Sequence, residues 1–359
     1  MIQVATELTE PSESITPLIT KSTSTVINMT SILEHDPMLF KKDGGFDFPE
    51  FYEYYEKAVA SVWRHQEVAM ESDLRDWQFN STPEERNVIA GILKGFVSAE
   101  LGIGCYWADK VCSIFPKPEV QSMARAFSFF ETIHAGAYSY LNDVLGLDEY
   151  DAFINDEVAR KKVETFFDNY SDKVSLGVFS GAGEGVSLFS SFSVLLSFNK
   201  DGRYKGLSQI ISWSAIDEQI HSEAGCKLFR YLVEETGLTA EEEEAVYEGF
   251  RLVVDNEEKF IDNIFNGYKL TTIDAQELKA YIRNRANERL CLLGLDQIFK
   301  LSTEELSKAK SIAAWFDPTI RGASSNDFFA QSRDGSNYSS KISQDFMSVD
   351  LTSLELSLV

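Results

Sequence analysis

Two of the four histidines in this chain follow a glutamate by three residues. The two pairs are Glu131 with His134, in FETIH, and Glu218 with His221, in DEQIH. Both pairs lie in strongly helical sequence, and residues i and i+3 project from the same face of a helix. Each pair can therefore bind one metal ion. The other two histidines, His35 and His65, have no such partner, and we expect them to be surface residues.

Two further glutamates stand inside apolar runs. Glu100 lies in GFVSAELGIGCYW and Glu184 in FSGAGEGVSLFSSF. A buried carboxylate is costly unless it is paired or bound to a metal. Glu100 precedes Glu131 by 31 residues and Glu184 precedes Glu218 by 34, so the chain has a glutamate, then an ExxH pair one helix later, and then repeats this order. The alternative is that these glutamates pair with arginines and bind no metal.

Four helices that each contribute one carboxylate, two of them adding a histidine, provide the ligand set of ferritin-like di-iron and di-manganese carboxylate proteins. Oxygen ligands with two imidazoles suit iron or manganese, whereas thiolate ligands are typical of zinc sites. The sequence therefore predicts a dinuclear metal site. There are two alternatives from a different class of function: metal storage, and a bundle in which the ExxH pairs are only structural.

Tyr138 adds a possible redox function to this site. It lies four residues after His134 and seven after Glu131, so the three side chains share one helical face within roughly 60°. A tyrosine beside a metal pair that activates dioxygen can be oxidised and hold a radical. The alternative is an ordinary buried tyrosine whose hydroxyl is hydrogen-bonded.

The elements that would position these residues are all helices. Residues 81–85, STPEE, have the form of a helix start, with a hydroxyl cap, a proline in the first turn and acids at the positive end of the dipole. The helix that follows is apolar on more than one face and continues past Trp107, as expected at the centre of a bundle. Further helices are predicted at 119–145, 148–170, 174–198, 206–236, 240–266, 274–293 and 303–316. Gly181, Gly183 and Gly185 predict a distortion in the 174–198 helix. Strand signals are weak, so the fold class is an all-α bundle.

The rest of the chain indicates its organisation and surroundings. Residues 1–30 are interpreted as an extended N-terminal arm, 31–330 as the helical domain, and 331–359 as a flexible tail whose apolar end is either a frayed terminus or a docking peptide.

The net charge of -24 argues against nucleic-acid binding. Four cysteines without a CxxC pair indicate a reducing compartment. No signal peptide or apolar run of ~18 residues is found, so we expect a cytoplasmic protein without a membrane span.

Four segments resemble those of class I ribonucleotide reductase small subunits. They are ETIHAGAY at 131–138, IDEQIH at 216–221, VWRHQEV at 62–68 and SNDFFAQSRDGSNY at 325–338. The resemblance implies a ferritin-like bundle with additional helices, acting as the radical-generating subunit of a thioredoxin- or glutaredoxin-dependent ribonucleoside-diphosphate reductase. It also implies a homodimer that works with a large subunit, where ribonucleotides are reduced.

The same resemblance implies a role for each site residue. The metal ligands would be Glu100, Glu131, His134, Glu184, Glu218 and His221. Tyr138 would store the radical, and Asp217 and Trp63 would form the internal part of a radical relay that His134 couples to one metal ion. Tyr338 would pass the radical to the large subunit, and the C-terminal residues would dock there.

Glu100 is a departure, because most members of this family have aspartate at this position. The longer side chain resembles the manganese/iron subgroup, yet that subgroup typically lacks the tyrosine that Tyr138 provides. The expected cofactor is therefore two metal ions per protomer, Fe/Fe or Mn/Fe, with Mn/Mn as a third option. Ser214, one turn before Glu218, stands where an apolar residue is more usual and would make the tyrosine pocket more polar. Another ferritin-like oxidase, such as a desaturase or ligand-binding oxidase, is the alternative, but it would not need Trp63, Tyr338 or a docking tail.

Overall fold

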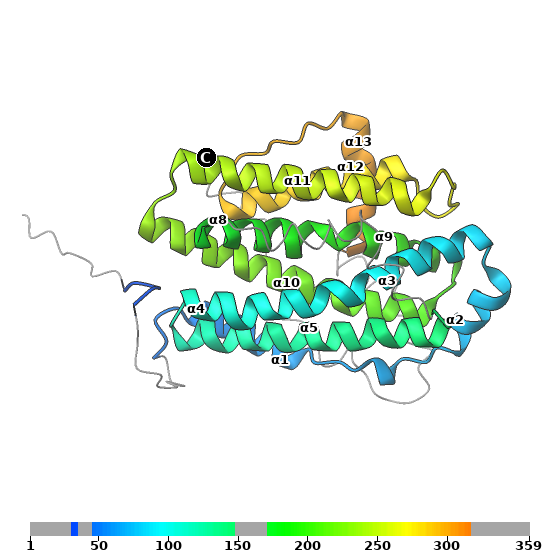
Figure 1. Ribbon diagram of the computed structural model, residues 1–359, viewed down its shortest axis with the longest axis horizontal. Helices are drawn as coiled ribbons and strands as arrows, with labels where there is room; N and C mark the ends of the chain where they lie inside the picture. Colours follow the sequence, from blue (N-terminus) through cyan, green and yellow to red (C-terminus); the bar gives the residue numbers. More distant parts are fainter. Residues whose placement is uncertain (1–29, 35–44, 148–170, 317–359) are drawn as a thin grey trace, which may run out of the picture. The chain divides into compact units, whose positions relative to one another are not determined.

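The computed structural model of the chain describes residues 30–34, 45–147 and 171–316, and these ranges contain helices but no strand (Figure 1). All described helices belong to one compact unit that begins at Ser31. Several predictions fall outside the described residues: most of the arm, the helix at 148–170, His35, Tyr338 and the tail from residue 331.

The helix that carries Glu100 begins where the sequence predicted. In α3 (Pro83–Cys105) the Thr82 hydroxyl accepts a hydrogen bond from the backbone N–H of Glu85, and the Glu85 carboxylate accepts one from Thr82 in return. This reciprocal cap satisfies two N–H groups that a helix start leaves without partners. The helix then changes to π-helical pitch in η3 (Tyr106–Val111) and ends in the short α4 (Cys112–Ile114).

Two long, regular α-helices carry the ExxH pairs. They are α5 (Pro118–Leu145), which ends at Gly146 with φ 68°, and α10 (Lys205–Thr236), which ends at Gly237 with φ 75°. The start of α10 is held by α2 (Glu71–Arg75), because Asp73 accepts hydrogen bonds from the backbone N–H groups of Gly206 and Leu207 at 3.0 and 2.7 Å. A carboxylate at this position satisfies free N–H groups and the positive end of the helix dipole.

The stretch with three glycines is distorted, as predicted. It consists of α8 (Asp172–Gly177), the π-helical η5 (Val178–Ser187), α9 (Phe189–Ser197) and the 3₁₀ turn η6 (Phe198–Asp201). A Cβ atom on Gly181 would lie 2.6 Å from the Phe250 ring, and one on Gly185 would lie 2.6 Å from Cδ of Arg289. Glycine is thus required at both positions by the close approach of neighbouring helices.

The four ligand-bearing elements pack in two pairs. Helix α3 lies along α5, η5 lies along α10, and α5 also contacts α10 (Figure 1). Around them, α1 (Pro49–Ala60) packs on α5, while α11 (Ala240–Phe265) and α12 (Ala275–Leu293) cover η5, with α13 (Thr303–Ala313) against α12. This arrangement directs the inner faces of α3, α5, η5 and α10 toward one another.

Two of these helical stretches, Pro83–Ile114 and Asp172–Asp201, are long and apolar enough to cross a membrane by length and composition. The apolar window of the second is 100% buried inside the protein. Each stretch also carries a fully buried glutamate, Glu100 or Glu184. Their apolar character therefore fits central helices of a bundle, which pass the same test.

Candidate metal centre

The structure brings all six predicted ligands together in the middle of the bundle, and each is at most 1% exposed. They form two groups, Glu100–Glu131–His134–Glu218 and Glu131–Glu184–Glu218–His221. Within each group, one ligand atom from every residue lies within 4.8 Å of the others. Glu131 and Glu218 belong to both groups. This overlap is the arrangement expected of two neighbouring metal ions that share two carboxylates.

The polar atoms of the site lack the partners that a buried group needs. Both carboxylate oxygens of Glu100 and of Glu218 lack a well-aligned hydrogen bond, as does Nδ1 of His221. His221 Nδ1 nevertheless lies only 2.8 Å from Oε1 of Glu131, so the donor atoms converge without being aligned for hydrogen bonding. Within the described part of the chain, no lysine or arginine forms an ion pair with these carboxylates, which argues against the arginine-paired alternative. Converging, orphaned oxygen and nitrogen atoms fit divalent cations.

The charges of the ligand set shift the pKa values of its own members. Burial, followed by the charges of Glu218 and Glu131, raises the pKa of Glu100 well above its ordinary value. Burial opposes protonation of His221, but the Glu131 and Glu218 carboxylates together outweigh it and raise the pKa of the imidazole to about 9. In the absence of metal, protons thus supply part of the positive charge that the site requires.

Tyr138 lies beside this cluster. Its side chain is fully buried, its ring centroid lies 4.6 Å from that of Phe96 and 6.2 Å from that of His134, and its hydroxyl forms no well-aligned hydrogen bond. Burial and then the charge of Glu100 raise the pKa of this hydroxyl well above its ordinary value. Ser214 lowers it by a smaller amount, and the serine hydroxyl itself donates to the carbonyl of Ile210 at 3.2 Å. Tyr138 is therefore a neutral phenol shielded from water.

The predicted relay residues are hydrogen-bonded in series. The indole N–H of Trp63 donates to Oδ2 of Asp217 at 2.8 Å, and Nε2 of His134 lies 3.1 Å from the same oxygen. The Trp63 ring also stacks on His134, with centroids 5.8 Å apart. A buried carboxylate thus joins the tryptophan to the imidazole whose other nitrogen, Nδ1, faces the metal ligands.

A second tryptophan, which the sequence did not single out, contacts the ligand set directly. The indole N–H of Trp107 in η3 donates to Oε1 of Glu184 at 2.5 Å. The two residues are 77 positions apart, and a tryptophan in an apolar helix is by itself an ordinary core residue. Only the packing of η3 against η5 reveals this contact.

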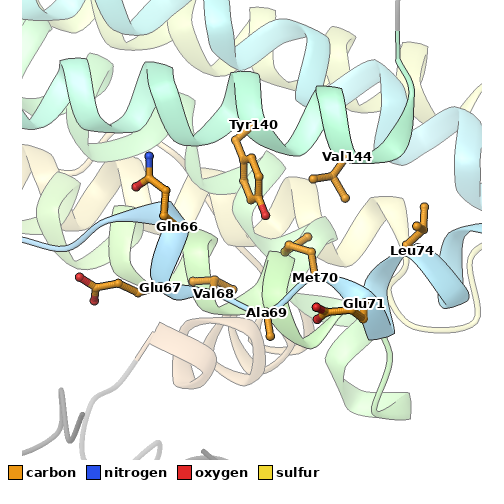
Figure 2. A pocket seen from close by; sticks show the side chains of 9 residues that line it. All are labelled: Gln66, Glu67, Val68, Ala69, Met70, Glu71, Leu74, Tyr140 and Val144. Carbon is orange, nitrogen blue, oxygen red and sulfur yellow. The ribbon is translucent and has the colours of Figure 1, made fainter. Parts of the chain in front are cut away.

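Close to the relay, the chain forms an open surface pocket of about 480 Å³ between residues 66–74 and α5 (Figure 2). Tyr140 and Val144 line it from α5, and Glu67 and Glu71 from the facing segment. None of the predicted ligands, and neither Trp63 nor Asp217 of the relay, lines it. His65, expected at the surface, is half-buried beside this pocket and stacks on Tyr140 with centroids 4.9 Å apart.

A helical bundle with two overlapping carboxylate–histidine groups at its centre, which could hold two metal ions, has the fold of ferritin-like proteins. More specifically, the chain belongs to the ribonucleotide reductase small-chain family, whose model matches residues 45–305. The family and fold predicted from the sequence are thereby confirmed.

Curated relatives agree with this assignment. A probable ribonucleoside-diphosphate reductase small subunit of Invertebrate iridescent virus 6 is 32% identical over 301 residues, covering 71% of this chain and 83% of the viral protein. Ribonucleoside-diphosphate reductase subunit M2 of Mesocricetus auratus is 25% identical over 325 residues, covering 82% of this chain and 81% of that protein.

Solved structures share the fold. A putative class I ribonucleotide reductase from Bacillus halodurans has a TM-score of 0.68 at 21% identity, covering 75% of this chain and 90% of that chain. A dimanganese(II) NrdF from Streptococcus sanguinis has a TM-score of 0.63 at 20% identity, covering 76% and 94%.

Proposed function

We propose that this chain is the radical-generating small subunit of a ribonucleoside-diphosphate reductase. The observation that carries the proposal is the buried six-residue ligand set with Tyr138 on one side and the Trp63–Asp217–His134 series on another. Metal storage needs neither the shielded tyrosine nor the hydrogen-bonded tryptophan. Within the proposal, ribonucleotides are reduced on the large subunit with which small subunits of this family work, and this chain supplies the oxidant.

The six ligands would hold two ions of iron or manganese per protomer, as Fe/Fe, Mn/Fe or Mn/Mn. Four carboxylates and two imidazoles are hard and borderline donors that suit these metals, and the four formal negative charges balance two divalent ions. The dimanganese(II) form of the similar Streptococcus sanguinis protein supports manganese as a candidate. When bound, the metal pair would supply the oxidising power that removes an electron from Tyr138.

The protein's own residues would control where the oxidant goes. Because Tyr138 is a neutral phenol, its oxidation would be accompanied by loss of the hydroxyl proton to a neighbouring base, and Glu100 is the charged group that acts most strongly on this hydroxyl. The Phe96 ring and full burial keep water from the phenol, which protects a stored radical. One oxygen atom of Asp217 contacts both the Trp63 indole N–H and the His134 imidazole. The two rings are therefore held in a fixed relative position, and a proton on either ring nitrogen lies next to the same carboxylate.

The partner assignments extend the proposal. The chain would form a homodimer in the cytoplasm, and residues 331–359 would dock on the large subunit, with Tyr338 passing the radical across. We expect deletion of residues 340–359 to leave metal binding and radical formation intact while removing activity with the large subunit. Full activity of the truncated chain would contradict the docking role.

The central experiment combines metal analysis with electron paramagnetic resonance. After loading with Fe(II) or Mn(II) and activation, the wild-type chain should contain two ions per protomer and show a tyrosyl signal. Tyr138→Phe should keep both ions but lose the tyrosyl signal and most of the reductase activity. A wild-type chain that binds no metal would overturn the proposal, and full activity of Tyr138→Phe would move the stored oxidant onto the metals.

A further inference from the structure

The two terminal carboxylates of the centre, Glu100 and Glu184, are held in different ways. Each belongs to only one of the two ligand groups. Neither oxygen of Glu100 accepts a hydrogen bond from a residue outside the ligand set. In Glu184, Oε1 accepts the indole N–H of Trp107, and only Oε2 is unpartnered. The structure therefore offers two free oxygens on one side of the centre and one on the other.

The Trp107 indole is itself fixed by its packing. It is fully buried, and its ring meets the rings of Phe127 and Phe179 edge-on, with centroids 4.9 and 5.6 Å away. On α10, a Cβ atom added to Gly225 would lie 3.3 Å from Cη2 of the indole, so this side is closely packed as well. An indole enclosed by three elements cannot turn its N–H to follow a carboxylate that rotates away.

The backbone beside Glu184 is also held. Nε of Arg285 donates to the carbonyl of Gly185, which is the next residue along η5. The Arg285 guanidinium is buried under the Phe189 ring, 3.2 Å from its centroid, and its Nη2 donates to the side chain of Gln219 at 2.8 Å. Glu184 is thus restrained through its side chain by Trp107 and through its main chain by Arg285.

We propose that Trp107 is a positioning residue that restricts Glu184 to binding metal through Oε2 alone. The inference rests on the proposed metal centre. A hydrogen bond from a neutral donor to a carboxylate is stronger than one between neutral groups, and breaking it inside a dry core would leave the indole N–H without a partner. Glu100, which has no such donor and a longer side chain than aspartate, is then the terminal carboxylate that is free to bind through one oxygen or two.

With this role for Trp107, the two metal positions differ in how many oxygen atoms their terminal carboxylate can supply. The position beside Glu184 receives one oxygen from its terminal carboxylate, whereas the position beside Glu100 has two available. Carboxylate groups around a metal site are commonly fixed by such outer partners, whose removal weakens metal binding about 10- to 100-fold. We therefore expect Trp107 to affect one of the two ions selectively.

The test is Trp107→Phe, compared with Trp77→Phe, which makes the same change at a half-buried tryptophan of η2 (Asp76–Asn80), away from the ligands. Both variants and the wild type are titrated with Mn(II), and the carboxylate stretching bands of the loaded proteins are recorded by infrared difference spectroscopy. In Trp107→Phe we expect the affinity for one ion to fall about 10- to 100-fold, the other ion to bind as before, and a carboxylate band to shift from one-oxygen to two-oxygen binding. Trp77→Phe should match the wild type.

The outcomes separate the inference from the proposed function. If the wild type binds no Mn(II), the metal centre itself fails. If the wild type and Trp107→Phe both bind two ions with the same affinities and the same carboxylate bands, the positioning role of Trp107 is wrong. Should Trp107→Phe fail to fold, a crystal structure of the Mn(II)-loaded wild type decides the question. Glu184 bound through one oxygen, with Trp107 still donating to the other, would support the inference, and Glu184 bound through both oxygens would overturn it.

Discussion

The helices that supply two ligands each differ from the elements that supply one. Helices α5 and α10, which carry the ExxH pairs, keep α-helical pitch throughout. The helix of Glu100 changes to π-helical pitch at Tyr106, and Glu184 lies within the π-helical η5. A glutamate and a histidine three residues apart share a face only at regular pitch, whereas a single carboxylate imposes no such condition. The α-helical pitch is thus kept where a glutamate and a histidine must stay three residues apart on one face. The π-helical pitch occurs where neighbouring helices approach closely and where residues outside the ligand set, such as Trp107, contact the ligands.

The strongest way to test this comparison is to remove a ligand shared by both groups. Glu218, on the regular α10, belongs to both ligand groups, while Glu100 belongs to one. Glu218→Ala should therefore abolish binding of both ions, and Glu100→Ala should leave one ion bound. Metal content after gel filtration measures the difference. Two ions retained by Glu218→Ala would show that the overlap of the two groups is not used.

The pH dependence of metal uptake tests whether protons must leave the ligand residues before metal binds. The pKa of His221 is raised to about 9, so below that pH the imidazole is protonated and must lose its proton before its nitrogen can bind metal. Burial likewise keeps Glu100 protonated above its usual range. Apparent affinity should therefore rise with pH up to about 9, and Mn(II) added at pH 7 should release protons into an unbuffered dye solution. Metal binding without proton release would contradict the raised pKa values of His221 and Glu100.

The close packing of the π-helical η5 can be tested by adding a methyl group to one of its glycines. In Gly185→Ala the new Cβ would lie 2.6 Å from Cδ of Arg289 and from Oγ of Ser222, so the apoprotein should lose about 1–3 kcal/mol of unfolding free energy. Urea unfolding of the metal-free chain measures this loss. An unchanged midpoint would mean that η5 relaxes easily and that its pitch does not depend on close packing.

The smallest expected effect has the opposite sign and lies on the regular part of α3. A Cβ added to Gly91 would meet only Cγ2 of Ile264, at an ordinary 3.8 Å. Because glycine in a helix interior costs about 0.5–1 kcal/mol relative to alanine, Gly91→Ala should stabilise the same apoprotein by a similar amount. A destabilised Gly91→Ala would show that α3 is as tightly packed there as η5.

The convergence of the six side chains could be predicted from the sequence because these residues carry a local signal. The i, i+3 spacing of Glu131 with His134 and of Glu218 with His221 follows from helix geometry, and Glu100 and Glu184 were conspicuous as acids within apolar runs. Helix starts were also predictable where a cap encodes them, as at Thr82. These features depend on residues close together in the chain.

What could not be predicted depends on contacts between distant segments. The hydrogen bond from Trp107 to Glu184 joins two elements whose register is set only by packing. The glycines of η5 indicated a distortion but not its π-helical form, since that depends on Phe250 and Arg289 from other helices. His65 had no sequence partner, yet packing places it against Tyr140.

The sharing of Glu131 and Glu218 between both groups also has a consequence for folding kinetics. The contact between α3 and α5 is between neighbours in the chain and can form early, but each group also needs Glu218 from α10. Contacts between distant segments form late, because the entropy of closing the intervening chain must be overcome first. In a zinc finger the metal directs folding, since its ligands are close in sequence. Here neither metal position is complete until α10 has packed against α5, so we expect metal uptake to follow folding of the bundle.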